Sequence, residues 1–388
     1  MYSVVSMTGL YIHVPFCVRK CKYCDFYSVP MRDGRGLPYP SACEMPSRFL
    51  DALAVELDEL PAGFRPDTVF IGGGTPTSLP VSEFGRLLEL LRSHVDPATV
   101  TEWTCEANPG ALDREKVRLL RDAGVNRMSL GIQSFDEQTL TFLGRIHSPT
   151  DARDAFQLLR DEGFSNINID LIYGIPVASR KIVRKDLEQL IALDPEHVAA
   201  YALIFEEETE ITRLRDEGAL DELNDDEQLE QYRLVRRLLE EAGYEHYEIS
   251  NFAKPGGACR HNVLYWSGGE YIGCGPAAHS HWEGVRYSNV RDVKMYCEAI
   301  VEGRSARDSE ERLDPEAKAR ESLVMGLRMI DGVTREDFLE RTGFDYMELR
   351  GEEIRWLRGH DLVEHSDGRL RLTEKGLFVS DSVFAELV

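Results

Sequence analysis

The stretch that decides the fold is His13-Val-Pro-Phe-Cys17-Val-Arg-Lys-Cys21-Lys-Tyr-Cys24-Asp-Phe26. It places three cysteines within eight residues, at the spacing CxxxCxxC. Three thiolates on one short loop can bind three irons of a four-iron, four-sulfur (4Fe–4S) cluster, which normally takes four cysteine ligands. No fourth cysteine follows nearby. We therefore predict a 4Fe–4S cluster on Cys17, Cys21 and Cys24, with one iron open to another ligand.

Two other interpretations of these cysteines are weaker. Free cysteine can serve as a small buried hydrophobe, but Arg19, Lys20 and Lys22 stand between the cysteines and suit a core segment poorly. Zinc prefers four ligands, often supplied as two separated pairs, and the chain contains no second CxxC.

The composition is that of a soluble globular protein. The 388 residues are 43% hydrophobic and 29% charged, and no run of about 18 apolar residues could span a membrane. The N-terminal residues lack the basic start and apolar core of a signal peptide, and eight cysteines in so long a chain do not resemble a disulfide framework. We therefore expect a cytoplasmic protein. Its net charge of −23 argues against nucleic-acid binding.

The first two hundred residues alternate short apolar strands with amphipathic helices, which predicts a parallel sheet covered by helices. The expected strands span 9–14, 68–71, 101–106, 127–131, 166–171 and 198–203. The expected helices span 47–60, 82–91, 113–123, 136–143, 151–162 and 184–193. Six such units are too few for a closed eight-fold barrel. The fold class is therefore α/β, an open partial (β/α)6 barrel.

Two further regions follow the predicted barrel of residues 1–210. Residues 211–313 form an extension, with a densely acidic stretch at 216–230 that leads into a helix at 228–241. Residues 314–388 read as three helices (315–329, 334–342, 346–358) and a hairpin (362–365, 370–373), which is a winged-helix pattern. From Pro315 onward, 11 basic residues face 16 acidic ones. The winged-helix-like domain is thus expected to be a structural or partner-binding cap. The Gly- and Pro-rich residues 30–46 are expected to form a loop.

Polar residues gather where the predicted strands end, which is where barrel folds build active sites. The second strand runs into Gly72-Gly73-Gly74-Thr75-Pro, whose glycines let a ligand approach the backbone closely. The following strands end in Cys105-Glu106-Ala-Asn108, Gly131-Ile-Gln133 and Asn168-Ile-Asp170. A glycine run is also typical of a tight turn, and a single carboxylate is often a surface or capping residue. Together they indicate a ligand site at this edge.

The cysteine motif resembles that of the radical S-adenosylmethionine (SAM) family, and Gly72–Pro76 resembles the SAM-binding motif of that family. The resemblance implies that the open iron binds the amino and carboxylate groups of SAM. An electron from a donor protein then cleaves SAM to a 5′-deoxyadenosyl radical. The motifs together resemble the oxygen-independent coproporphyrinogen III oxidase-like branch, over most of the chain. That resemblance implies that SAM is contacted by Tyr11, Tyr23, Gly73, Gly74, Thr75, Glu106, Gln133, Arg145, Asp170 and Ala202.

These residue types suit SAM chemically. Glu106 and Asp170 can hold its amine or its ribose hydroxyls. Arg145 can bind its carboxylate as a bidentate donor. Tyr23, which lies between two cluster cysteines, can pack against the adenine.

Two departures from the decarboxylating enzyme of this branch stand out. That enzyme has a further cysteine two residues after the third, where this chain has Phe26. It also carries a long segment before its first strand, whereas eight residues precede Gly9 here. Both features belong with decarboxylation of the porphyrinogen.

A later segment, Cys259-Arg-His261-Asn262-Val-Leu-Tyr265-Trp266, contains HNxxYW. This resembles the signature of the haem chaperone (HemW-type) subgroup, which implies that His261, Asn262, Tyr265 and Trp266 form a haem site. His261 can be an axial iron ligand, with Cys259 as a second candidate, and the aromatic residues offer flat faces. Alternatively, His261 and Asn262 cap a turn and Trp266 is core.

The glycine-rich stretch 273–281, which carries His279 and His281, is expected to line the same cavity.

We expect a carrier that binds haem and passes it to an acceptor protein that the sequence does not identify. The alternative is a radical-SAM enzyme acting on a tetrapyrrole, by coproporphyrinogen III dehydrogenase-like oxidative decarboxylation or by haem-modifying methyl transfer. Dependence of SAM turnover on a tetrapyrrole would favour the enzyme. A nucleic-acid binder is a third and disfavoured interpretation, because of the net charge.

Overall fold

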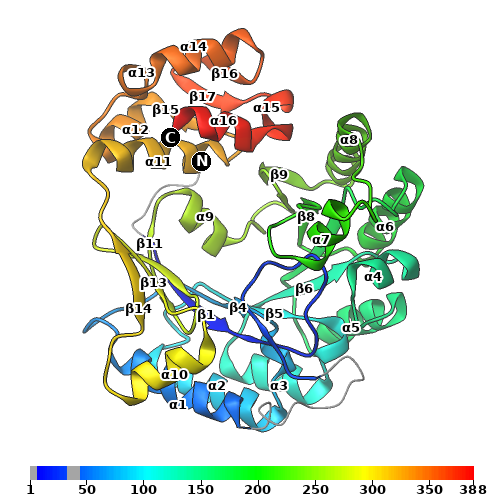
Figure 1. The fold of residues 1–388 in the computed structure, drawn as a ribbon, viewed down its shortest axis with the longest axis vertical. Coiled ribbons are helices and arrows are strands. Elements are labelled where there is room, and N and C mark those ends of the chain that lie inside the picture. Colours follow the sequence, from blue (N-terminus) through cyan, green and yellow to red (C-terminus); the bar gives the residue numbers. More distant parts are fainter. Residues whose placement is uncertain (1–6, 33–43) are drawn as a thin grey trace.

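The computed structural model describes residues 7–32 and 44–388 (Figure 1). The N-terminal residues that were searched for a signal peptide, and most of the loop predicted at 30–46, lie outside these ranges. Within the described ranges, none of the helices combines the length and the hydrophobicity that a membrane crossing requires.

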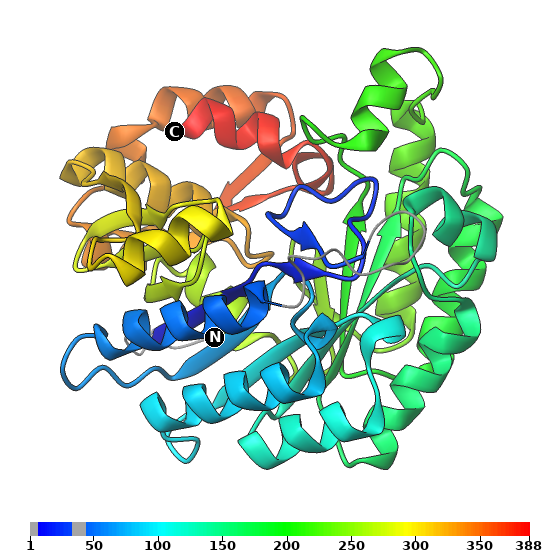
Figure 2. The ribbon, with the colours of Figure 1, turned by 60° about the horizontal axis from the view of Figure 1, so that its bottom comes forward.

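Six parallel strands form the centre of the fold and confirm the predicted partial barrel. They are neighbours in the sheet in chain order: β1 (Thr8–Val14), β4 (Thr68–Gly73), β5 (Glu102–Ala107), β6 (Arg127–Gln133), β7 (Ile167–Tyr173) and β8 (His197–Ala202). Helices cover the outer face of the curved sheet (Figure 2). These are α1 (Met45–Asp58), α2 (Val81–His94), α3 (Arg114–Ala123), α4 (Glu137–Leu143), α5 (Pro149–Asp161), α6 (Arg180–Leu193) and α8 (Asp225–Glu241).

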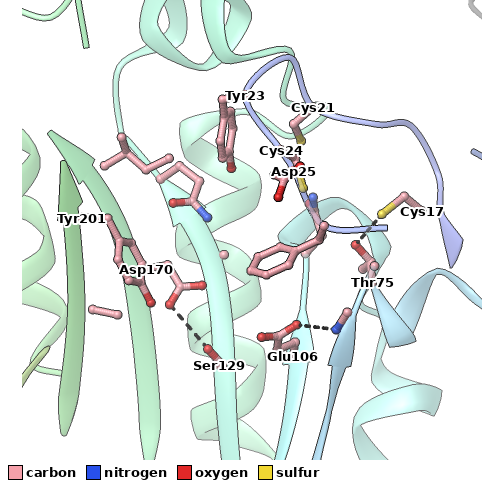
Figure 3. Close-up of a pocket in the computed structure, with 18 of the residues that line it drawn as sticks. Cys17, Cys21, Tyr23, Cys24, Asp25, Thr75, Glu106, Ser129, Asp170 and Tyr201 are labelled. Carbon is pink, nitrogen blue, oxygen red and sulfur yellow. Dashed lines mark hydrogen bonds between the residues drawn. The ribbon is translucent and has the colours of Figure 1, made fainter. Parts of the chain in front are cut away.

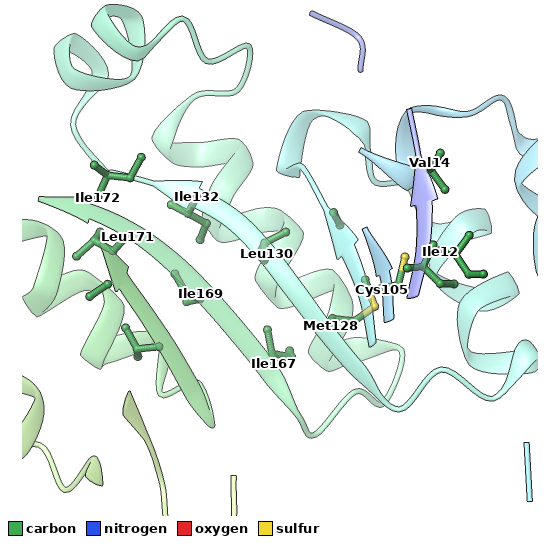
Figure 4. Packing of buried hydrophobic residues seen from close by; sticks show 14 of the residues in the cluster. Ile12, Val14, Cys105, Met128, Leu130, Ile132, Ile167, Ile169, Leu171 and Ile172 are labelled. Carbon is green, nitrogen blue, oxygen red and sulfur yellow. The ribbon is translucent and has the colours of Figure 1, made fainter. Parts of the chain in front are cut away.

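The strands form because their side chains alternate between two environments. One set is apolar and packs against the outer helices, as Met128, Leu130, Ile167 and Ile169 do with no exposed surface (Figure 4). The intervening residues face the inside of the barrel, and most of these are polar. A sheet needing only stability would bury apolar residues on both faces. The polar inner face is therefore where a site can be built.

The sheet continues past both ends of the predicted six strands and has twelve strands within residues 7–32 and 44–388. On one side β11 (Glu270–Cys274) pairs with β1 in parallel, followed by antiparallel β12 (His279–Trp282), β13 (Val285–Asn289) and β14 (Arg307–Glu311). On the other side β10 (Asn251–Ala253) and β9 (Glu245–Glu248) follow β8. The terminal strands β14 and β9 do not meet, so the barrel is open. The division of the chain at residue 210 stays a prediction, and the sheet runs through it.

Short elements surround the site and the sheet edges. They are β2 (Phe16–Cys17), β3 (Val29–Pro30), α7 (Glu210–Asp216), α9 (Arg260–Trp266) and α10 (Val293–Val301). In both ribbon views α9 lies close to the inner strands, between the sheet and the C-terminal domain (Figures 1 and 2).

The C-terminal domain has the predicted winged-helix-like order of helices and a hairpin. It comprises α11 (Pro315–Leu327), β15 (Val333–Thr334), α12 (Arg335–Thr342), α13 (Tyr346–Leu349), α14 (Gly351–Gly359), β16 (Val363–Ser366), β17 (Arg369–Leu372), α15 (Glu374–Phe378) and α16 (Ser380–Leu387). The hairpin turns at Asp367 and Gly368, both at positive φ as a tight primed turn requires.

One element of this domain corrects the sequence analysis. We expected a single helix over 346–358, but it is divided at Arg350, whose φ of −138° is not helical. The Arg350 side chain donates hydrogen bonds to the carbonyls of Leu387 and Val388. This tertiary contact holds the break and is invisible to helical periodicity.

Candidate functional site

A cavity of about 480 Å³ opens at the carboxyl ends of the barrel strands (Figure 3). Its lining comes from the cysteine loop, from β4 to β8 and from α9. Cavities that bind drug-sized ligands range from about 300 to 1,000 Å³. Its size therefore suits one such ligand.

All three motif cysteines line this cavity and are partly exposed. Two backbone hydrogen bonds fix their loop, from Lys22 N to Leu143 O (3.1 Å) and from Ile211 N to Lys22 O (3.0 Å). Cys17 Sγ lies 3.5 Å from Thr75 Oγ1, and Arg145 Nη1 donates to Cys21 Sγ at 3.3 Å. The loop is thus anchored to α4 and the residues that follow it, to α7, and to the segment after β4.

The thiols fit the ligand set of an iron–sulfur cluster. Burial, together with the neighbouring Cys21 and Cys17, raises the pKa of the Cys24 thiol to about 12. Such thiols give up their protons when a metal binds. Across the described residues, no three His, Cys, Asp or Glu side chains converge closely enough for a single metal ion. A 4Fe–4S cluster instead takes its thiolates at separate corners.

The glycine run after β4 serves the packing of the cysteine loop. A Cβ on Gly74 would lie 2.5 Å from the carbonyl oxygen of Phe16, and one on Gly73 would lie 2.7 Å from the His13 ring. Gly73 also has a φ of 102°, which favours glycine. Its amide donates to Glu106 Oε2 at 3.2 Å (Figure 3). The glycines therefore bring the cysteine loop, β4 and a cavity carboxylate together.

Two carboxylates are buried in the cavity wall. Burial, and then the nearby Asp170, raise the pKa of Glu106 to about 8. Burial likewise raises the pKa of Asp170, although Asn168 and Ser129 donate hydrogen bonds to it (Figure 3). Two buried carboxyls without full compensation form a site that favours a cationic ligand.

Two further buried polar atoms at the cavity have no hydrogen-bond partner within the described residues. Arg145 donates to Gly131 O and Cys21 Sγ, but its buried Nε has no hydrogen-bond partner in the described part of the chain. The same holds for Oε1 of Gln133, a residue at the positive φ of 73°. Buried polar atoms are normally paired. These orphan atoms indicate that a polar ligand completes the cavity.

Nine of the ten predicted SAM contacts line this one cavity: Tyr23, Gly73, Gly74, Thr75, Glu106, Gln133, Arg145, Asp170 and Ala202. Tyr11 does not line it. Its hydroxyl lies 3.1 Å from His13 Nδ1, and its ring packs against Phe70. Sequence reasoning missed other inward-facing residues of the cavity, among them Arg127, Ser129, His197 and Tyr201. Their two-residue alternation along β6 and β8 was the signal that could have found them.

The HNxxYW motif forms helix α9, which closes the inner end of this cavity with Asn262. His261 is 1% exposed and stacks on Phe70. Its Nδ1 lies 2.8 Å from Thr68 Oγ1 and its Nε2 lies 2.8 Å from the Tyr265 hydroxyl. Burial and the nearby Arg127 lower the pKa of His261 to about 3, so the ring is neutral. Both nitrogens are engaged, and iron ligation by His261, which stays a prediction, requires at least one of these bonds to break.

The aromatic residues expected to hold a porphyrin already contact other parts of the protein and are half-buried. Arg328 lies over the Trp266 ring, 4.2 Å from its centroid. Tyr265 packs edge-on against Tyr271, with centroids 4.5 Å apart. Cys259, the second candidate ligand, is fully buried. The contacts of His261 are structural, but the N-cap residue of α9 makes no side-chain capping bond and Trp266 is only half-buried, so the haem-site and structural interpretations of the motif both stay predictions.

The expectation for residues 273–281 is wrong for this cavity. None of them lines it, and Gly273 and Cys274 instead line a separate cavity of about 130 Å³. His279 is exposed, and His281 lies 3.2 Å from the carbonyl oxygen of Gly269 through Nδ1. Strand β11, which runs in parallel beside β1, carries this stretch to the opposite side of β1 from the cavity.

Glu102 anchors the motif helix to the barrel. Its buried carboxylate accepts hydrogen bonds from the amides of Arg260 (2.9 Å) and His261 (3.0 Å) and from Cys259 Sγ (3.4 Å). It also lies close to the fully buried Arg127. One side chain at the start of β5 therefore both caps α9 and offsets a buried charge.

We expect Glu102→Ala to lower the free energy of unfolding by about 3 kcal/mol, because it removes the acceptor of the Arg260 and His261 amides and a carboxylate close to the buried Arg127. Denaturant unfolding followed by circular dichroism measures this. Glu89→Ala, an exposed glutamate on α2, is the matched control and should change stability by less than about 0.5 kcal/mol. Equal effects of the two substitutions would show that Glu102 anchors nothing.

Comparisons with known proteins agree with this geometry. The profile described as "Radical SAM superfamily" matches residues 11–190, and the one described as "HemN C-terminal domain" matches residues 313–379. Proteins named "Heme chaperone HemW" from Lactococcus lactis and Bacillus subtilis are each 35% identical to this chain. The alignments cover 97% of this chain in both cases, and 96% and 98% of the relatives.

A similar protein of the same name from Escherichia coli is 35% identical, over 86% of each chain. Among solved structures, coproporphyrinogen III oxidase (HemN) from Escherichia coli, described as a radical SAM enzyme, superimposes with a TM-score of 0.82. That alignment covers 98% of this chain and 90% of the other, at 20% identity. At that identity the likeness supports the fold alone.

Proposed function

Since this chain belongs to the haem chaperone (HemW-type) subgroup of the oxygen-independent coproporphyrinogen III oxidase-like radical-SAM family, we propose that it binds haem and transfers it to an acceptor protein. In this proposal the barrel holds a 4Fe–4S cluster and SAM. The observation that carries the proposal is the 35% identity to haem chaperones along nearly the whole chain.

The cavity supports the two cofactors through its own residues. Cys17, Cys21 and Cys24 would hold the cluster, which supplies one-electron chemistry when bound. Arg145, whose Nε is still unpaired among the described residues, would bind the carboxylate of SAM. Glu106 and Asp170 would receive its cationic amine or its ribose hydroxyls.

Three further residues complete the proposed SAM site. Tyr23 lines the cavity between the cysteines and would pack against the adenine. Gly73 and Gly74 would admit the ligand close to the backbone. Asn262 of α9 would close the inner end, so the HNxxYW motif contributes to the same cavity as the cluster motif.

A radical-SAM enzyme acting on a tetrapyrrole is the second candidate. One observation favours it: nine predicted SAM contacts surround a single cavity, and a pure carrier has no evident need for such a site. Phe26, which stands where the decarboxylating enzyme has a cysteine, favours the carrier. Production of 5′-deoxyadenosine that depends on added haem or coproporphyrinogen would favour the enzyme.

Anaerobic titration of the cluster-loaded protein with haem tests the carrier. We expect saturable binding near one haem per chain, seen as a shift of the haem absorbance band. Haem should then leave the protein faster when an acceptor apoprotein is present than when buffer alone is present. Linear, unsaturable uptake would reject haem binding and with it the carrier.

A further inference from the structure

Two large apolar side chains stand exposed at the cavity. Phe26 is 67% exposed and Ile204 is 58% exposed, and both line the cavity that holds the motif cysteines. Phe26 follows the last cysteine, whereas Ile204 follows β8, on the far side of the barrel strands. Single exposed apolar residues are ordinary, but two from distant segments bordering one cavity indicate a surface that an apolar ligand covers.

The size of the cavity decides where a tetrapyrrole can lie. Its volume of about 480 Å³ suits one drug-sized ligand, and the proposed SAM contacts already surround that volume. A haem is itself a large molecule and does not fit beside SAM. It can approach these residues only across the mouth, where Phe26 and Ile204 are exposed.

The charges around the mouth suit the polar edge of haem. Arg19 and Lys20 are exposed, lie on the cysteine loop and line the cavity with Phe26. The lining also contains the carboxylates of Asp25 and Glu206. In a chain of net charge −23, the exposed Arg19 and Lys20 are cations of this lining that can meet the haem propionates, while Asp25 and Glu206 reduce the local positive charge.

The contacts made by the residues of α9 also favour a haem site at the mouth over one on α9. The rings of Trp266 and Tyr265 pack against Arg328 and Tyr271, and both nitrogens of His261 are hydrogen-bonded. A haem on α9 would have to displace all these contacts, whereas one at the mouth displaces only water.

We propose that haem docks across the cavity mouth, with its ring on Phe26 and Ile204 and its propionates toward Arg19 and Lys20. This inference rests on the proposed haem-carrier function and names its site. The haem then lies over the cluster loop and the SAM cavity, so loading of the cavity can influence haem binding directly.

The test is an anaerobic haem titration of cluster-loaded Phe26→Ser, Ile204→Ser and the double variant. We expect each single variant to weaken haem binding about tenfold and the double variant by more, because one large apolar side chain contributes about a factor of ten when it is buried. Arg19→Gln with Lys20→Gln should weaken binding of haem but leave binding of haem dimethyl ester unchanged. Iron content and cluster absorbance confirm that each variant keeps its cluster.

Val301→Ser and Met295→Ser are the matched controls. Both residues lie on α10, are 76% and 59% exposed, and do not line the cavity. If Phe26→Ser disturbs the neighbouring cluster, Ile204→Ser still tests the mouth site, because Ile204 lies outside the cysteine loop. Haem affinity unchanged in the double variant but lost in His261→Ala would overturn the mouth site and leave the carrier function standing. Absence of saturable haem binding in the unmodified protein would instead reject the carrier function itself.

Discussion

Replacing Cys17, Cys21 or Cys24 by alanine will leave the protein without its iron–sulfur cluster. In the proposed cluster each thiolate would hold one iron corner, and one further iron would already lack a cysteine ligand. The other cysteines of the described residues cannot substitute, because Cys105, Cys259, Cys274 and Cys297 are buried and none lines the cavity. Iron content and visible absorbance after anaerobic reconstitution should both fall to background in each of the three variants.

Cys297→Ala is the control for this prediction. Cys297 lies on α10, away from the cavity, and its loss should leave the iron content per chain at the level of the unmodified protein. Wild-type iron content and absorbance in even one of the three motif variants would disprove the cluster assignment.

The barrel could be predicted because its strands and helices carry strong local patterns. Strand β4 is an apolar run and β7 alternates apolar with polar residues, and both lie within two residues of their expected bounds. The strands added at the sheet edges were not predicted. Every residue of β14 is exposed and its sequence is Arg-Asp-Ser-Glu-Glu, as suits an edge strand that must not aggregate. Such a strand is defined by its neighbour in the sheet and has no apolar period of its own.

The candidate site, too, has a part that could be predicted from the sequence and a part that could not. The cysteines, Glu106 and Gln133 lie at or just beyond strand ends, and Asp170 lies on the inner face of the neighbouring β7. Because parallel strands bring such positions together, their meeting follows from the chain order. The contacts that surround His261, in contrast, do not follow from the chain order. Its partner Thr68 is 193 residues away in sequence, and Arg328, which covers Trp266, belongs to the C-terminal domain. Whether a histidine is open to iron depends on such distant contacts.

The position of α9 links both parts of the molecule. It is capped by Glu102 of the barrel, lines the cavity through Asn262, and packs against α11 and Arg328. The HNxxYW motif is thus a joint between the barrel cavity and the C-terminal domain. A signature of this kind can mark a subgroup without contacting haem, because the joint fixes the shape of the cavity.

SAM binding should strengthen as pH rises, and Glu106 should be the cause. Burial, together with Asp170, raises the pKa of Glu106 to about 8, so below that pH the carboxyl is protonated and neutral in the empty cavity. A cationic ligand favours the ionised form and must expel this proton. Between pH 6.5 and 8.5 the dissociation constant for SAM should therefore fall about tenfold or more, by linkage of one proton to binding.

Glu106→Gln removes the titrating group, so it should weaken SAM binding by about tenfold to a hundredfold at pH 8.5 and by much less at pH 6.5. Anaerobic calorimetric titration of the cluster-loaded proteins measures the dissociation constant for SAM of the variant and of the unmodified protein at each pH. The ratio of these two constants is compared, because protonation of SAM itself affects both equally and cancels. Glu188→Gln, an exposed glutamate on α6, should leave the ratio at one. A ratio for Glu106→Gln that stays constant across the pH range would mean that Glu106 does not meet the cation, and would leave Asp170 as the carboxylate that receives it.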